Sequence, residues 1–289
     1  MSMPSNPLPE DDQATAYPSP TEYADSALSP DPNVAPLEPM PPPQARFPAW
    51  SWWDTLAVLG FTVFAVFLFS VIALAIARTI PKYQHIPVAD LAMDPHIVVG
   101  AQATAYPVIL VVIFVLVRSR THQRFRDAIH WNWPGVSAPG FFIAGSVLAL
   151  IVEGLSSFLP IPKSLPMDNY FHNASSAYLL AAFGITLAPL LEEVFFRGML
   201  YPLARRAFGL AIAVLVTAAA FAAIHGAQLG YAWSPILSIF VVGVVFTVTR
   251  ARMDSVAASF LMHCGYNFAL FTALWIASDH YRHLEKVTG

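Results

Sequence analysis

The chain of 289 residues is 56% hydrophobic and only 11% charged, whereas soluble domains usually carry about 25% charged residues. This surplus of apolar side chains favours a membrane protein. The net charge of −3 comes without a basic cluster interleaved with aromatic residues, which argues against nucleic acid as a partner. The single cysteine, Cys264, excludes an internal disulfide and a cysteine-rich zinc site.

Residues 1–49 differ in composition from the rest of the chain. They are rich in Pro, Ser, Asp and Ala, contain seven acids and one base, and show no apolar periodicity. Such a segment buries too little apolar surface to offset its chain entropy, so we expect a disordered, Pro-rich tail. It also lacks the basic and then apolar regions of a signal peptide. Residues 50–289 are then expected to form one transmembrane domain.

Seven apolar segments follow the tail, and each approaches the length of about 20 residues that a helix needs to cross a bilayer. The predicted spans are 56–77, 97–117, 141–159, 178 to about 207, 210–228, 235–249 and 255–277. We therefore expect an all-α, polytopic helical bundle of about seven transmembrane helices, with membrane lipids around it.

Arginines are concentrated in alternate loops between the predicted spans. They are Arg118, Arg120, Arg124, Arg126, Arg205, Arg206, Arg250 and Arg252. The positive-inside rule places these loops and the N-terminal tail in the cytoplasm. The sequence therefore predicts an integral protein of the plasma membrane with a cytoplasmic N-terminus, and seven spans leave the C-terminus on the other side.

Strongly polar side chains inside the predicted spans are few, and each is a functional candidate because a bilayer makes them costly. They are Glu153, Glu192, Glu193, Arg197, His225, His263 and Asn267. Glu192 and His225 are nearly equidistant from Gly209, so a hairpin turning there brings both to one depth. His263 and Asn267 are one turn apart on one face of the last span. Three helices can thus present Glu, His, His and Asn around one point.

Adjacent residues do not share a helix face, so Glu192 and Glu193 should have different roles. Arg197 follows Glu193 at ion-pairing spacing, which predicts a structural pair that lowers the cost of both charges. Glu192 then stays available as a general base. His225 and His263 could orient water, donate to an oxyanion or bind a metal. From the residues alone, a purely structural Glu–Arg pair and histidines that only pack stay open.

These polar residues resemble the motifs of the CAAX protease and bacteriocin-processing family (CPBP, or Abi) of intramembrane proteases, which includes the type II CAAX-prenyl endopeptidases. The family motifs EExxxR, FxxxH and HxxxN/D correspond here to Glu192, Glu193 and Arg197, to Phe221 and His225, and to His263 and Asn267. The resemblance covers about residues 175–275, which we take as the protease core. It implies an all-helical membrane fold and hydrolysis of peptide bonds.

The resemblance also implies roles for the motif residues. Glu192 would activate water with His225, His263 and Asn267 would stabilise the oxyanion, and the neighbouring Glu–Arg pair would hold the architecture of the site. Family members are often described as metalloproteases, and Glu192, His225 and His263 could hold zinc with one position left for water. The motif HExxH is absent, so a zinc mechanism and a metal-free mechanism are both open.

Three functions compete for these residues. The first is an intramembrane endopeptidase that acts on membrane-anchored peptides or proteins, with prenylated CaaX tails as one substrate class. The second is a non-proteolytic immunity or scaffold protein of the same fold that uses the polar cavity to bind a partner. A proton-coupled transporter is the third, but the sequence lacks the paired broken helices of inverted repeats.

Overall fold

The computed structural model describes residues 48–160, 162, 164–171 and 173–284. Apart from its last two residues, the predicted tail 1–49 lies outside this range. Within the described residues the secondary structure consists of helices and turns, without a strand. The predicted all-α fold class is therefore confirmed.

The helices that build the bundle follow the predicted spans closely. They are α2 (Trp52–Thr79), α4 (Pro95–Arg120), α6 (Ala138–Ser156), α7 (Ala174–Ile185), α8 (Leu187–Glu193), the π-helix η4 (Val194–Leu200), α9 (Tyr201–Ile224), α10 (Trp233–Met253) and α11 (Val256–Ala277). The connections contain α3 (Val88–Leu91), α5 (Phe125–Ala128) and the 3-10 turns η1 (Pro81–Tyr83), η2 (Gly135–Ser137) and η3 (Pro166–Tyr170).

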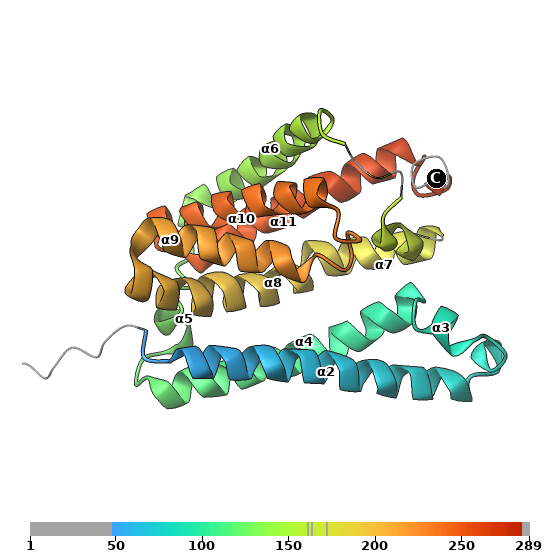
Figure 1. The fold of residues 1–289 in the computed structure, drawn as a ribbon, viewed down its shortest axis with the longest axis horizontal. Coiled ribbons are helices and arrows are strands. Elements are labelled where there is room, and N and C mark those ends of the chain that lie inside the picture. Colours follow the sequence, from blue (N-terminus) through green and yellow to red (C-terminus); the bar gives the residue numbers. More distant parts are fainter. Residues whose placement is uncertain (1–47, 161, 163, 172, 285–289) are drawn as a thin grey trace, which may run out of the picture. The chain divides into compact units, whose positions relative to one another are not determined.

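Six helical segments of the described chain are long and apolar enough to cross a membrane, and the longest of them, Ala174–Ile224, has 51 residues. This segment is not one straight helix, because Gly209 interrupts it with φ 78° and ψ 179°. The chain folds back there (Figure 1), so that the rings of Phe196 and Phe221 lie 5.4 Å apart. The two limbs count as two spans, which agrees with the predicted number of about seven.

Two prolines explain further irregularities in the first limb. A proline has no N–H, and its ring clashes with the carbonyl four residues earlier. The ring of Pro189 clashes in this way with the carbonyl of Ile185, where α7 ends before α8 begins. The ring of Pro202 would likewise clash with the carbonyl of Gly198, which lies in the turn that has widened into the π-helix η4. The residues of the EExxxR motif therefore lie at the junction of α8 and η4, between two proline-induced distortions.

The helices α6 and α11 approach each other through two glycines. A Cβ atom on Gly145 of α6 would overlap the main-chain oxygen of Met262, and one on Gly265 of α11 would overlap that of Phe142. The hydroxyl of Ser146 also donates to the Gly265 carbonyl over 2.9 Å. Small residues allow membrane helices to approach so closely. This contact fixes the position of α11, which carries the HxxxN motif.

The helices α2 and α4 form an antiparallel pair beside the rest of the bundle (Figure 1). Arg120, at the end of α4, donates two hydrogen bonds to Asp54, at the start of α2, and the shorter of them is 2.6 Å. The indole N–H of the buried Trp50 donates to the Met199 carbonyl of η4 over 3.1 Å. The segment that precedes α2 is thereby attached to the π-helix.

Candidate active site

A buried polar cluster forms where η4 and α8 meet α11. The Arg197 Nη1 and Glu193 Oε1 atoms are 2.9 Å apart, and neither side chain is exposed. The same Glu193 oxygen lies 3.1 Å from His263 Nδ1. Because a carboxylate oxygen paired with a guanidinium accepts hydrogen bonds, Nδ1 of His263 carries the hydrogen of this contact. Glu193 thus joins Arg197 to His263.

Two further N–H groups of Arg197 are bound by residues of α10. Nη2 donates to the Gly243 carbonyl over 3.0 Å, and Nε donates to the Thr247 hydroxyl over 3.3 Å. The guanidinium carbon also lies 4.5 Å from the ring centre of Phe221 and 5.5 Å from that of Phe246. These contacts compensate for removing the cation from water.

Sequence reasoning missed the residues of α10, which carries none of the three motifs. The available signal was the spacing in "GVVFT", where Gly243 and Thr247 are four residues apart and share a helix face. That spacing is common in membrane helices, and nothing in it identifies Arg197 as the partner.

Glu192 differs from its neighbour, as adjacent positions on a helix should. Its side chain is 17% exposed, and its Oε2 lies 3.7 Å from Nε2 of His263. This distance is too long for a direct hydrogen bond. Glu192 therefore keeps acceptor capacity for a water molecule or a substrate group, whereas Glu193 is fully buried and its Oε1 is bound to Arg197 and His263.

His225 occupies the C-cap position of α9 and is half-buried. Its Nδ1 lies 2.9 Å from the Phe221 carbonyl, which can only accept, so Nδ1 carries a hydrogen. The Phe221 ring packs against both histidines of the motifs, with centroid distances of 5.0 Å to His225 and 5.7 Å to His263. The phenylalanine of the FxxxH motif thus lies beside both imidazoles and the Arg197 guanidinium.

Asn267 is directed to the break between α7 and α8. Its amide nitrogen donates to the Gly184 carbonyl over 2.6 Å, which is one of the carbonyls that a helix end leaves open. One of its two amide hydrogens is used there. Glu153 is exposed on α6, outside the buried cluster.

Whether the site can hold a metal ion depends on which ligand side chains lie close together. Within the described part of the chain, no three His, Cys, Asp or Glu side chains are gathered closely enough to hold a metal. Of the three proposed ligands, His263 directs Nδ1 to Glu193, which leaves Nε2 as its ligand atom. The chemistry below is therefore derived from the residues of the chain, and the zinc set of Glu192, His225 and His263 stays a prediction.

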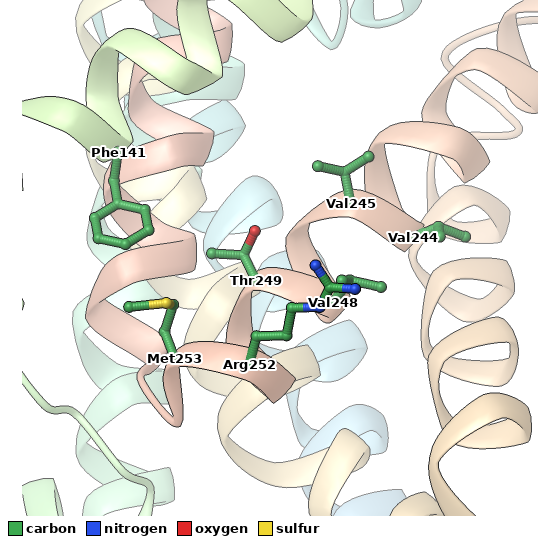
Figure 2. A pocket seen from close by; sticks show the side chains of 7 residues that line it. All are labelled: Phe141, Val244, Val245, Val248, Thr249, Arg252 and Met253. Carbon is green, nitrogen blue, oxygen red and sulfur yellow. The ribbon is translucent and has the colours of Figure 1, made fainter.

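A separate groove of about 350 Å³ lies along α10. Figure 2 shows its lining residues, which are Phe141, Val244, Val245, Val248, Thr249, Arg252 and Met253. The groove is mainly apolar and contains no residue of the three motifs. Its walls therefore do not belong to the Glu–His cluster.

Comparison with known proteins identifies the segment that carries the cluster. Residues 174–269 match the family model described as "Type II CAAX prenyl endopeptidase Rce1-like", and this range contains every residue of the three motifs. A search of curated proteins and a search of solved structures gave no significant match. Residues 174–269 are thus similar to the type II CAAX prenyl endopeptidases, and the apolar helices of the chain make it an integral membrane protein.

Proposed function

We propose that the protein is an intramembrane endopeptidase that hydrolyses peptide bonds of membrane-anchored peptides through a water molecule activated by Glu192. One observation carries this proposal. Glu192 is the partly exposed carboxylate of a pair whose other member, Glu193, is fully buried and bound to Arg197 and His263. The cluster thus offers one carboxylate to solvent and substrate while the other is held in place.

In the proposed reaction, a water molecule next to Glu192 gives a proton to the carboxylate as its oxygen attacks the scissile carbonyl carbon. His225 supports this step because its Nδ1–H is bound to the Phe221 carbonyl, which leaves Nε2 as an acceptor for the second hydrogen of the water. Glu192 then returns its proton to the amine that leaves when the C–N bond breaks.

The oxyanion of the tetrahedral intermediate requires hydrogen-bond donors. His263 can supply one from Nε2 in its protonated form, because its Nδ1–H remains bound to Glu193. Asn267 can supply its second amide hydrogen, because the first is bound to Gly184. Arg197 has no part in this step, since its fully buried guanidinium is held by Glu193, Gly243 and Thr247.

The proposed substrates are peptides attached to the membrane, with prenylated CaaX tails as the first class to test. This choice rests on the family match over residues 174–269. We further propose a plasma-membrane location with the arginine-rich loops and the N-terminus in the cytoplasm, because basic residues are retained on that side. A substrate anchored in the inner leaflet would then reach the site from the bilayer.

The test is cleavage of a prenylated CaaX peptide and its unprenylated counterpart by the purified protein in lipid nanodiscs. We expect Glu192→Gln, which keeps the size of the side chain, to reduce kcat by about 10²- to 10⁴-fold. Glu153→Gln is the matched control, since it removes a carboxylate from another predicted span outside the cluster, and it should cleave like the wild type.

Undiminished cleavage by Glu192→Gln would refute the assignment of the base. A folded wild-type protein that cleaves neither peptide would refute the CaaX substrate class. If such a protein also bound a membrane-anchored partner equally well with and without Glu192→Gln, the non-proteolytic scaffold function would replace the endopeptidase.

A further inference from the structure

The π-helix η4 places a proline where the main-chain donor to the Arg197 carbonyl would lie. Tyr201 N–H donates to the Phe196 carbonyl, which is the i to i+5 pairing of a π-helix. The same pattern would pair the Arg197 carbonyl with the N–H of residue 202. Position 202 is a proline and has no N–H. Because a buried carbonyl without a donor is costly, another group must satisfy the Arg197 oxygen.

Arg250 of α10 supplies that donor. Its Nε donates to the Arg197 carbonyl over 3.3 Å, and its Nη1 donates to Asp254 Oδ1 over 2.8 Å. The Arg250 side chain is only 3% exposed, although it lies in the last turn of its helix. A guanidinium presents several donors in a fixed plane, so one side chain can hold both acceptors at once.

The far end of this contact is held by a network at the turn between α10 and α11. Asp254 adopts a left-handed conformation there, with φ 47°. Its second carboxylate oxygen lies 2.8 Å from His130 Nδ1, and its carbonyl accepts from the Asn132 amide over 2.7 Å. The loop before α6 and the α10–α11 turn together fix the guanidinium of Arg250.

We propose that Arg250 is a positioning residue of the site, which keeps η4 in its widened form by satisfying the Arg197 carbonyl that Pro202 leaves open. Gly243, Thr247 and Arg250 recur at intervals of four and three residues on one face of α10. The first two bind the Arg197 side chain, and Arg250 binds the Arg197 main chain. One helix face therefore fixes the residue that orients Glu193.

The kinetic consequence rests on the proposed endopeptidase function. Without Arg250, η4 would shift relative to α11, and the distance between the adjacent carboxylates and His263 would change. A displacement of reacting groups by about 1 Å can reduce the rate by about 100-fold. The effect should fall on kcat rather than KM, since the buried Arg250 guanidinium is bound to the Arg197 carbonyl and to Asp254 and would act on the site through η4.

The kinetic experiment compares Arg250→Met and Arg250→Lys with Arg252→Met in nanodiscs, with rates corrected for the folded fraction. Arg252 is exposed in the same helix turn and lines the apolar groove, so it is the matched control. We expect Arg250→Met to lower kcat by about 10- to 100-fold with KM changed less than about twofold. Arg250→Lys should rescue part of this loss, because an ammonium can still donate. A normal kcat in the folded Arg250→Met fraction would overturn the proposal.

A second experiment needs no activity and separates this proposal from the proposed function. Arg250→Met should speed hydrogen–deuterium exchange in the peptide covering residues 194–203 by at least about 10-fold, whereas Arg252→Met should not. Pro202→Ala gives position 202 an N–H that can bond the Arg197 carbonyl, so Arg250→Met should then have a smaller effect. If Arg250→Met speeds the exchange equally with and without Pro202→Ala, Arg250 does not act by satisfying the carbonyl that Pro202 leaves open, and the proposal is overturned. This outcome does not depend on the cleavage of any substrate.

Discussion

Arg197→Met provides the most direct test of the buried Glu193–Arg197 pair. Methionine keeps most of the volume of the arginine stem and removes the guanidinium. Glu193 would then be a carboxylate with no exposed surface, and His263 would be its remaining partner in the cluster. The Gly243 carbonyl and the Thr247 hydroxyl would also lose their bonds to Arg197.

The expected loss in the free energy of unfolding can be estimated from this geometry. At 2.9 Å, the attraction between two unit charges is about 6 kcal/mol for an effective dielectric constant of about 20. Removing one partner of a buried pair costs about 3–5 kcal/mol. Because His263 still contacts Glu193, we expect a loss of about 3 kcal/mol in the free energy of unfolding for Arg197→Met.

The control is the double variant Glu193→Gln/Arg197→Met, which leaves no uncompensated charge. Denaturant titration in mixed micelles, followed by near-UV circular dichroism, measures both variants against the wild type. We expect the double variant to recover about half of the loss, since replacing both partners of a buried pair is often close to neutral. A loss below about 1 kcal/mol for Arg197→Met, or a double variant as unstable as the single one, would refute the argument.

Three further predictions follow from other parts of the structure. Gly265→Ala should cost about 1–3 kcal/mol through overpacking against the Phe142 carbonyl, whereas Gly154→Ala, with open space around its Cβ position, should change the thermal midpoint little. Burial alone would raise the pKa of Asp254, but hydrogen bonds from two basic neighbours outweigh it and hold the pKa below the ordinary 3.8. The stabilisation from this carboxylate is therefore present above that pH and lost below it, so the small difference in thermal midpoint between wild type and Asp254→Asn should vanish in acid. Dialysis against a chelator should leave peptide cleavage unchanged, since no three ligands converge in the described chain, and a loss that zinc alone restores would instead support the zinc set.

Much of the helical framework could be predicted from the sequence, because apolar length and a few intramembrane charges are local signals. The number of residues on each side of Gly209 predicted a hairpin that brings Glu192 and His225 to one depth. The rings of Phe196 and Phe221 are in contact in the structure. The four-residue spacing of Glu193 and Arg197 likewise predicted an ion pair, and their charged atoms are 2.9 Å apart.

Other features depend on which helices are neighbours, and periodicity does not carry that information. The contacts of Thr247 and Gly243 with Arg197 arise because α10 packs against η4. The direction of the Asn267 amide, toward the Gly184 carbonyl, depends on the break between α7 and α8. From its spacing alone Asn267 was expected to act beside His263. One of its amide hydrogens is bound to Gly184 instead, so only the second could take that role.

The two prolines of the first limb connect these observations. A membrane helix tolerates proline only where other groups satisfy the carbonyls that it frees. After the break at Pro189, Asn267 of α11 donates to a carbonyl at the end of α7, and beside Pro202, Arg250 of α10 donates to the Arg197 carbonyl. Both distortions are thus fixed by the helices that also bind the polar cluster. Glu192 and Glu193, the last two residues of α8 before η4, lie 3.7 Å and 3.1 Å from the two ring nitrogens of His263.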